Sequence, residues 1–292
     1  MIRIFALALL LLLPALAEAE PLPVVASFSV LGDMVRQIGG ADVAVTVLVG
    51  PDSDSHVYEP SPSDTRRLAT ARLFVVNGLG LEGWIPRLIG SAGFKGRVVT
   101  ATDGITPLQL SEAGKTAPDP HAWQDVADGR IYVRNIAAAL AEADPAHAQA
   151  YAERAAAYDA ALVVLDDWVR AEIGSVPPER RKIVTTHDAF QYFGHAYGVA
   201  FEAPVGMNEE SEPDARAVAA LIRQIRQEHI RALFIENMTD PRLLDQLARE
   251  TGTKPAGALL ADALSKPGEG GESYIALFRR NVPAMVAAMM GN

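Results

Sequence analysis

The sequence predicts an α/β protein of two lobes, each with a parallel sheet flanked by helices, joined by one long rigid helix. Short apolar segments alternate with amphipathic segments through both halves of the 292 residues, which is typical of βαβ units. Between the halves lies one uninterrupted helical pattern from Asp144 to Ile173. At about 1.5 Å per residue this helix spans roughly 45 Å, so we interpret it as a strut between two lobes.

The strut begins and ends at recognisable signals. Asp144 is the expected N-cap, and Pro145 is the first helical residue, where a missing N–H costs nothing. Asp166 and Arg170 are spaced to form an i, i+4 ion pair, and Gly174 ends the helix. One stripe of residues, each three or four positions after the last, is expected to face inward: Tyr151, Ala155, Tyr158, Leu162, Leu165 and Val169.

The N-terminus resembles a secretory signal. Arg3 is followed by the apolar run Phe5–Leu13, which is shorter than the about 20 residues of a membrane span, and by an A-x-A cleavage site at Ala17–Ala19. We therefore divide the chain into four parts: a signal peptide over 1–19, an N-terminal α/β lobe over 20–143, the linker helix over 144–174 and a C-terminal α/β lobe over 175–292.

The composition limits where the protein is expected to reside and which partners it is expected to bind. The chain has no cysteine, which excludes disulfides, thiolate metal sites and a lipid-modified cysteine. We therefore expect a periplasmic protein that is secreted by a cleaved signal peptide and carries no lipid anchor. The formal net charge of −10 argues against nucleic acid as a partner, because phosphate binding needs clustered Lys and Arg.

In the N-terminal lobe, the strands are short runs rich in Val, Leu and Phe, and the helices begin at capping residues. Ser61 with Asp64 three residues on predicts a capping box, and Asp125 predicts a second N-cap. The expected strands are Pro23–Ser29, Val43–Val49, Leu73–Val76 and Arg97–Ala101, and the expected helices are Val30–Ile38, the segment capped by Ser61, Glu82–Ile89 and the segment from Asp125 to Glu142. The stretch between Ala101 and Asp125 is predicted to be loop.

The C-terminal lobe shows the same alternation of predicted strands and helices. Ser211 is the expected N-cap of one helix, and Asp240-Pro241 is expected to start the next. The expected strands are Lys182–Thr186, Val199–Pro204, Ala232–Glu236 and Gly257–Leu260, and the expected helices are Ala189–Tyr197, Glu212–His229, Asp240–Thr251 and Ser273–Met290.

Three of the six histidines, His56, His121 and His187, lie at the end of a predicted strand or in the loop after one, and Asp262 follows the last strand. In open α/β sheets, ligands bind beyond the carboxyl ends of the strands. Two of these residues precede the strut and two follow it, so all four can meet across the cleft between the lobes. Three neutral imidazoles and a carboxylate complete a tetrahedral site for a divalent transition metal.

The competing interpretation of each such histidine is a solvated loop residue. We interpret the other three histidines as structural: His147 in the first turn of the strut, His195 inside a helix, and His229 at a helix end, where positive charge is favourable.

Three carboxylates near the candidate ligands have two interpretations of equal weight. Asp119, Asp188 and Glu236 can orient the ligand imidazoles through hydrogen bonds. Alternatively, Asp119 belongs to a turn before Pro120, Asp188 caps a helix, and Glu236 is an acceptor at a strand end.

At these residues the chain resembles a known family. In order, the segments DSHVYEPSPSD, NGLGLEGW, DPHAWQD, THDAFQYFGHAYG, FIENMTDPRLLDQLARETG and LLADALS resemble the zinc- and manganese-binding solute receptors of ABC importers. The resemblance covers essentially the whole mature chain. It implies two α/β lobes joined by one long helix, with metal ligands at His56, His121, His187 and Asp262.

The resemblance also implies a function. The protein is expected to bind Zn²⁺, or Mn²⁺ as second choice, as transported ligand and to deliver it to the transmembrane subunits of an ABC permease. A periplasmic metallochaperone is a further candidate partner, and a monomer is expected. The third ligand is glutamate in some members and His187 here. The segment before His121 lacks the histidines that are typical of high-affinity zinc receptors.

The competing class is a periplasmic zinc-dependent hydrolase that uses the three histidines with water in an open position. Asp262 discriminates between the two, because a metal that also binds Asp262 has no position left for water. The chain has no H-E-x-x-H motif, so we expect a protein that is not an enzyme. An adhesion or metal-handling protein that works without a permease is a third interpretation.

Overall fold

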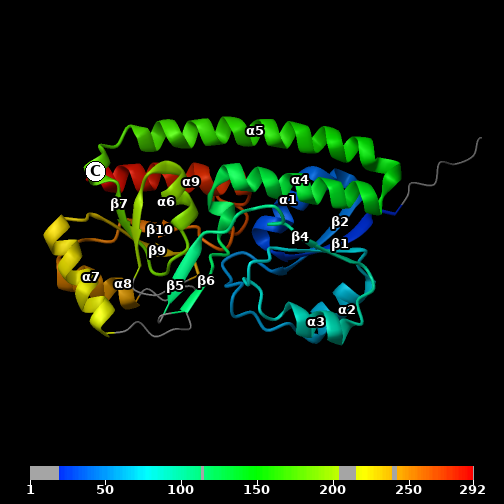
Figure 1. The fold of residues 1–292 in the computed structure, drawn as a ribbon, viewed down its shortest axis with the longest axis horizontal. Coiled ribbons are helices and arrows are strands. Elements are labelled where there is room, and N and C mark those ends of the chain that lie inside the picture. The colour runs from blue at the N-terminus through cyan, green and yellow to red at the C-terminus, as the bar shows by residue number, and fades with distance from the viewer. Residues whose placement is uncertain (1–19, 113–114, 204–214, 239–241, 292) are drawn as a thin grey trace, which may run out of the picture.

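The computed structural model describes residues 20–112, 115–203, 215–238 and 242–291. It contains two four-stranded parallel sheets with helices packed around them, and one long helix extends over both (Figure 1). The predicted fold class is thereby confirmed. The expected signal peptide over 1–19 lies outside the described residues.

The N-terminal sheet has the strand order β2-β1-β3-β4, and every pair is parallel. Its strands are β1 (Leu22–Phe28), β2 (Val43–Val49), β3 (Leu73–Val76) and β4 (Arg97–Thr100). Its helices are α1 (Ser29–Gly39), α2 (Pro62–Thr70), α3 (Ile85–Ala92) and α4 (Val126–Ala143). All four residues of β3 are buried, as expected for an inner strand covered on both faces.

The predicted caps explain where two of these helices begin. Ser61 Oγ accepts from the Asp64 N–H, and the Asp64 carboxylate accepts from the Ser61 N–H at 2.8 Å, which is the predicted capping box. Asp125 Oδ1 accepts from the Ala127 N–H at 2.8 Å at the start of α4. Helix α3 begins three residues later than predicted, because the Glu82 carboxylate instead accepts from the Asn77 N–H at 2.7 Å and closes the end of β3.

The C-terminal sheet has the order β10-β9-β7-β8, which is the same topology once the strands are numbered within their own lobe. Its strands are β7 (Lys182–Val184), β8 (Ala200–Glu202), β9 (Ala232–Glu236) and β10 (Gly257–Leu259). Its helices are α6 (Gln191–Tyr197), α7 (Ala215–Glu228), α8 (Arg242–Thr251) and α9 (Tyr274–Met290). The predicted helix starts at Ser211 and at Asp240-Pro241 lie outside the described residues.

The strut is α5 (Ala148–Gly174), with 27 residues, and it begins later than the sequence predicts. Residues Pro145–His147 form a separate 3₁₀ turn, so Asp144 is not the N-cap of α5. Its carboxylate instead accepts from Tyr151 Oη at 2.8 Å and pairs with His147 Nδ1 at 2.6 Å. The predicted inward stripe is buried apart from Ala155, which is half-buried. The buried residues of the stripe are Tyr151, Tyr158, Leu162, Leu165 and Val169.

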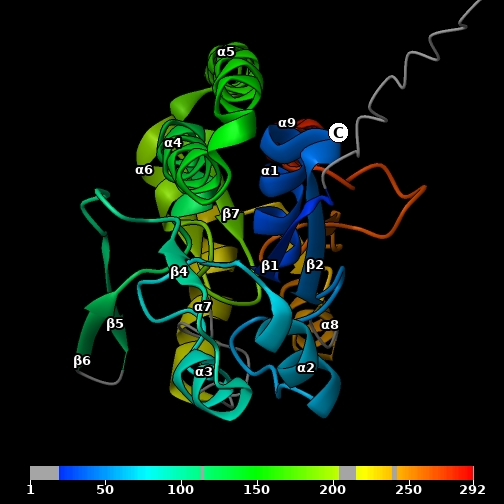
Figure 2. The same ribbon diagram turned by 90° about the vertical axis from the view of Figure 1, so that its right-hand side faces the viewer.

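Polar contacts fix the strut to both lobes, and the helix passes over both sheets (Figures 1 and 2). Arg154 donates to the carbonyl oxygens of Ile38 and Gly39 at 2.6 and 2.8 Å, at the end of α1. At the other end, Arg170 forms the predicted pair with Asp166 at 3.0 Å and donates to the Ala196 carbonyl, in α6, at 2.8 Å. The strut is therefore held on each lobe by charged side chains as well as by its apolar stripe.

A short antiparallel hairpin stands where a loop was predicted. It consists of β5 (Gln109–Glu112) and β6 (Lys115–Pro118) and projects from the body in Figure 2. Its base is closed by the Asp119 N–H, which donates to the Leu108 carbonyl at 2.8 Å. The hairpin ends immediately before the segment that carries His121.

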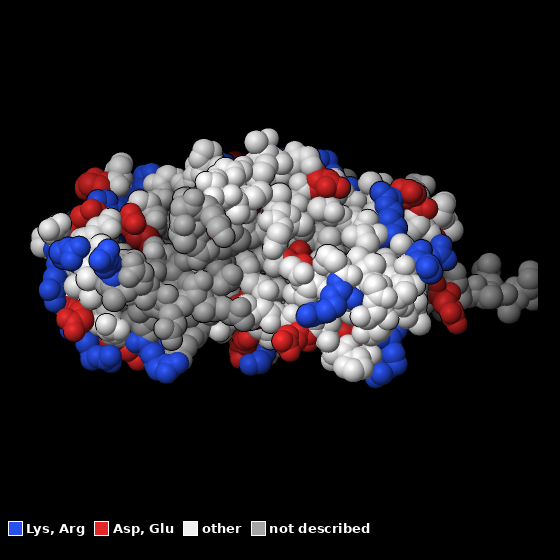
Figure 3. Space-filling view, turned by 60° about the horizontal axis from the view of Figure 1, so that its bottom comes forward, with Lys and Arg blue, Asp and Glu red and all other residues white. Residues whose placement is uncertain are grey.

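The apolar core is shared between the lobes and the strut, with a smaller cluster beneath α7 and α8. On the face shown in Figure 3, basic and acidic side chains are interspersed among uncharged ones, as on an ordinary solvated surface. Within the described ranges, no helix is long and apolar enough to cross a membrane.

Candidate metal centre

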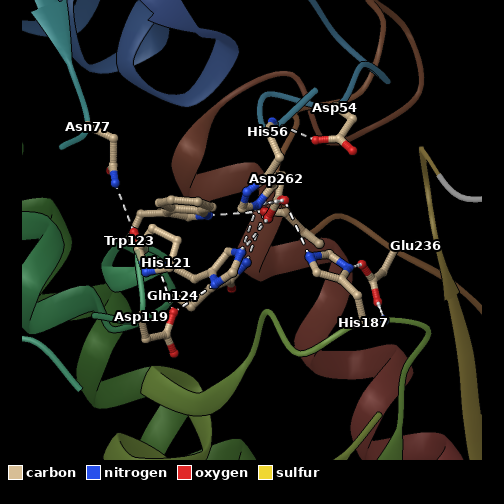
Figure 4. A network of polar contacts seen from close by, with 12 residues as sticks. Asp54, His56, Asn77, Asp119, His121, Trp123, Gln124, His187, Glu236 and Asp262 are labelled. Atoms are coloured by element: carbon tan, nitrogen blue, oxygen red, sulfur yellow. Dashed lines mark hydrogen bonds and ion pairs between the residues drawn. The ribbon is translucent and has the colours of Figure 1, made fainter. Parts of the chain in front are cut away.

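The four candidate ligands lie in loops at the carboxyl ends of the two sheets. His56 follows β2, His187 follows β7 and Asp262 follows β10, whereas His121 follows the β5–β6 hairpin. Because all strands of the two larger sheets are parallel, the loops of His56, His187 and Asp262 lie at the carboxyl ends of these sheets. The segment of His121 joins them there from the hairpin. The four side chains meet there, with Asp262 between the three histidines (Figure 4).

The donor atoms are spaced as ligands of a single ion. One nitrogen from each histidine and one oxygen of Asp262 all lie within 4.8 Å of one another. Nε2 of His56 is 3.2 Å from Nε2 of His121 and 3.2 Å from Oδ2 of Asp262. Nε2 of His187 lies 3.4 Å from the same oxygen, and Nε2 of His121 lies 3.7 Å from Oδ1.

Burial makes this arrangement costly without a cation. The side chains of His121, His187 and Asp262 are inaccessible to solvent, and that of His56 is 5% exposed. The oxygens of Asp262 face imidazole nitrogens, so the ionised form of this buried carboxylate depends on positive charge on those histidines. A divalent cation between the four groups would supply that positive charge instead and would offset the desolvation penalty of the carboxylate.

Asp119 fixes the orientation of His121. Its Oδ1 lies 2.7 Å from His121 Nδ1 and accepts from the His121 N–H at 2.9 Å. A carboxylate can only accept, so Nδ1 carries the proton and the Nε2 lone pair of the neutral ring is directed at the cluster. Tyr192 Oη, in α6, donates to the Asp119 carbonyl at 2.9 Å and holds the same segment from the other lobe.

Glu236 does the same for His187. Its Oε2 contacts His187 Nδ1, and its Oε1 accepts from the N–H groups of Thr186 and His187 at 3.0 and 3.1 Å. The Thr186 hydroxyl donates to the same oxygen at 2.9 Å. Of the two open interpretations of Asp119 and Glu236, the structure therefore favours contact with the imidazoles.

His56 is held differently. Asp54 Oδ1 accepts from the backbone N–H of His56 at 2.7 Å, so this carboxylate fixes the main chain and not the ring. Among the described residues, no carboxylate contacts Nδ1 of His56. Burial raises the pKa of Asp54, although His56 acts in the opposite direction.

The electrostatics of the metal-free cluster favour protonated histidines and an ionised aspartate. Burial acts to lower the pKa of His121, but the carboxylates of Asp262 and Asp119 raise it above its ordinary value. Burial is likewise outweighed at His187, whose pKa is raised well above 6.5 by Glu236 and Asp262. Burial would raise the pKa of Asp262, but His121 and His187 hold it well below its usual range. When no metal is bound, protonation of His121 and His187 beside an ionised Asp262 is therefore favoured.

Two buried hydrogen bonds join the lobes beside the cluster. Trp123 Nε1 and Gln124 Nε2 both donate to the Ala261 carbonyl, at 3.0 and 2.9 Å. They connect the loop of His121 to the residue that precedes Asp262. Figure 4 shows Trp123 and Gln124 beside the cluster. Sequence reasoning missed both; the only available signal was that they belong to the DPHAWQD segment.

The remaining histidines and Asp188 lie outside the cluster. His147 pairs with Asp144, whereas His195 and His229 are exposed on helix α6 and just after α7. Asp188 accepts from the Gln191 side chain, at Nε2, at 2.7 Å, whereas the N-cap of α6 is Phe190 and no side-chain hydrogen bond caps this helix. The interpretation of Asp188 as a helix cap is therefore wrong.

Two α/β lobes, a long helix over both and a buried cluster of potential metal ligands between them define the class of metal-binding substrate-binding proteins of ABC importers. The comparisons agree. The chain belongs to the family described as zinc-uptake complex component A, periplasmic, whose family model matches residues 24–288.

Relatives and solved structures place the chain within this class. It is 34% identical over 272 residues to the manganese-binding lipoprotein MntA of Halalkalibacterium halodurans, covering 93% of this chain and 90% of the relative. It is 30% identical to the manganese ABC transporter substrate-binding lipoprotein PsaA of Streptococcus pneumoniae, covering 91% and 88%. The solved structure of the periplasmic zinc-binding protein TroA from Treponema pallidum matches with a TM-score of 0.87 and 31% identity, covering 92% and 99%.

These relatives contradict one expectation from the sequence. We expected a secreted periplasmic protein without a lipid anchor, whereas MntA and PsaA are lipoproteins, which are anchored to a membrane. The expectation rested on the absence of cysteine. That absence therefore does not decide where the protein resides.

Proposed function

We propose that this protein captures one divalent transition-metal ion with His56, His121, His187 and Asp262 and delivers it to the transmembrane subunits of an ABC permease. The observation that carries the proposal is the convergence of four potential donor atoms within 4.8 Å at a largely buried point between the lobes. The family of the chain and its similarity to PsaA, a manganese ABC transporter substrate-binding lipoprotein, support the transport role.

Zinc is the proposed metal. Three imidazole nitrogens and a carboxylate are borderline donors that suit Zn²⁺ in tetrahedral geometry. Ligands bound at 2.0–2.1 Å around a tetrahedral ion lie about 3.3 Å from one another. The closest donor pairs match that spacing: 3.2 Å for His56 with His121, 3.2 Å for His56 with Asp262 and 3.4 Å for His187 with Asp262.

Manganese is the second candidate, and a specific feature favours it. Both oxygens of Asp262 face the imidazoles, Oδ2 toward His56 and His187 and Oδ1 toward His121. A carboxylate that binds through both oxygens gives a five-coordinate site, which suits a harder ion than zinc. The names of MntA and PsaA also specify manganese.

We further propose that the protein is not an enzyme. A hydrolytic zinc site needs an open position for an activated water. Here the Asp262 carboxylate lies between the three histidines, where it would complete the coordination shell. A monomeric state and a metallochaperone partner stay predictions from the sequence.

X-ray absorption spectroscopy of the metal-loaded protein tests the site. For zinc we expect four ligands, with Zn–N distances of about 2.0–2.1 Å and one oxygen from Asp262. Five or six ligands with a bidentate carboxylate would overturn the zinc assignment, particularly if protein from its native host carries manganese. Competition between the two metals in solution does not identify the native metal, because zinc binds more tightly than manganese at almost any such site. Loss of metal uptake on deletion of the gene tests the transport role.

A further inference from the structure

Asp52 links the loop that carries His56 to two loops of the other lobe. Its Oδ1 accepts from Asn237 Nδ2 at 2.7 Å, and its Oδ2 lies 3.1 Å from Lys266 Nζ. Its backbone N–H donates to the Leu264 carbonyl at 3.2 Å. Three separate atoms of one residue thus contact the C-terminal lobe.

These partners stand next to the metal-site residues in sequence. Asp52 lies four residues before His56, Lys266 lies four residues after Asp262, and Asn237 directly follows Glu236. Asp52 therefore connects the loop of His56, whose Nδ1 contacts no carboxylate of the described residues, to the two loops that carry Asp262 and the partner of His187.

The loop of His56 is also tied to its own lobe, where Trp84 Nε1 donates to the Ser55 carbonyl at 2.9 Å. That bond cannot hold the loop against the opposite lobe. The contacts of Asp52 do, and they are partly solvated: the side chain of Asp52 is 20% exposed and that of Lys266 64% exposed. Solvated ion pairs break and reform more readily than buried hydrogen bonds such as those of Trp123 and Gln124.

We propose that Asp52 is a latch that holds the His56 loop closed over the bound metal and sets the rate of metal release. The proposal rests on the proposed function. Opening the latch frees His56 from the cluster while His121, His187 and Asp262 stay in place with their own partners. Asp52 acts on the metal through His56 and touches none of the donor atoms, so it is a positioning residue.

The backbone of Asp52 decides which variants test this. Its φ is +51°, in the left-handed region that glycine and asparagine tolerate and alanine does not. Asp52→Gly removes both side-chain contacts without backbone strain. Asp52→Asn keeps the backbone and an acceptor for Asn237 but loses the charge that pairs with Lys266. Lys266→Met removes only the ion pair.

The experiment is stopped-flow release of Zn²⁺ from the full chain to an excess of a chromophoric chelator, at low and high salt. We expect release to be at least tenfold faster for Asp52→Gly, several-fold faster for Asp52→Asn and two- to threefold faster for Lys266→Met. High salt should abolish the difference between Lys266→Met and the parent, because it screens a solvated ion pair. Asp103→Asn, an exposed aspartate after β4, makes the same charge change as Asp52→Asn and should release at the parent's rate.

Two outcomes would overturn the latch. Release from Asp52→Gly at the parent's rate would show that the contacts do not hold the loop. An altered visible spectrum of Co²⁺-loaded Asp52→Gly would show that Asp52 acts on the coordination shell itself. If the parent binds no metal, or binds it as well after His121→Ala, the proposed function fails instead, and the two failures are thereby distinguished.

Discussion

The two sides of the candidate metal centre are built for different tasks. On one side, His121 and His187 are inaccessible to solvent, and each contacts a buried carboxylate through Nδ1. On the other side, His56 is slightly exposed, and its neighbouring carboxylate holds only the backbone. We infer that metal affinity and metal exchange depend on different ligands of one site. The fixed side, with His121 and His187, would retain the ion, whereas the side of His56 can open.

Replacing single ligands tests the difference between the two sides of the site with the largest expected effect on zinc affinity. His121→Ala and His187→Ala should each weaken zinc binding by at least a hundredfold, because each removes a donor and leaves a buried carboxylate without its partner. His56→Ala should weaken binding by at least tenfold but less than either, because it leaves no buried carboxylate without the imidazole Nδ1 that it contacts. Competition titration against a chromophoric chelator measures all three.

The matched controls are His147→Ala and His229→Ala, which change histidines outside the cluster and should leave affinity as in the parent. Equal losses at all three ligands would remove the proposed difference between the two sides. Unchanged affinity in every ligand variant would place the metal site elsewhere.

Neutralising the carboxylates that orient the imidazoles tests the same difference between the two sides, with a smaller expected effect on zinc affinity. Glu236→Gln and Asp119→Asn keep the shape of the side chain but weaken the hold on the ring, and should reduce zinc affinity by about 10- to 100-fold. Asp54→Asn keeps the oxygen that accepts from the His56 N–H, so it should change affinity less than threefold. The same titration measures these variants, and a loss at Asp54 as large as at Glu236 would show that His56 is held as firmly as His187.

The fixed side also predicts how stability depends on pH. The pKa values of His121 and His187 in the metal-free protein are raised by their carboxylate neighbours. Their contribution to stability is therefore fully present below the unfolded value of about 6.5 and is lost as pH rises through the folded pKa. Metal binding needs neutral imidazoles, so affinity should rise over the same range.

Thermal unfolding from pH 6 to pH 9, with chelator and with zinc, measures both trends. We expect the midpoint of the metal-free protein to fall with pH, and the stabilisation by zinc to grow. At a free zinc concentration a thousand times Kd, this stabilisation is about 4 kcal/mol. A stabilisation that shrinks between pH 6 and pH 9 would contradict protonated histidines in the metal-free site.

The sequence predicted the elements whose signals are local. Runs of Val, Ile, Leu and Phe located the strands, and Ser61 with Asp64 located a helix start. The strand-end rule selected the four residues that the structure brings together. Parallel topology explains this for His56, His187 and Asp262, whereas His121 reaches the same place from the β5–β6 hairpin. Asp119 and Glu236 could not be assigned, since a carboxylate near a strand end serves a turn or an imidazole equally well until distances are known.

What the sequence could not predict depends on contacts between distant segments. The β5–β6 hairpin has strands of four residues each with mixed polarity, so it carries little periodic signal. The contact of Asp52 with Asn237 spans 185 positions, and that of Trp123 with Ala261 spans 138. Asp144 was assigned to the strut because Asp-Pro is a common helix start, whereas its carboxylate contacts His147 and Tyr151, which lie three and seven residues further along the chain.

The smallest expected effect is the change of overall shape on metal binding. Hinge closure needs a linker that can absorb large backbone rotations. The strut instead has a continuous α-helix of 27 residues, anchored by Arg154 on the N-terminal lobe and by Arg170 on the C-terminal lobe. The buried bonds of Trp123 and Gln124 to Ala261 join the lobes again beside the site. If only the His56 loop opens, small-angle scattering of metal-free and zinc-loaded protein should be nearly superimposable, with radii of gyration that agree within about 1 Å. A decrease of several ångströms on loading would mean that whole lobes move, and the division into a fixed and an opening side would then be wrong.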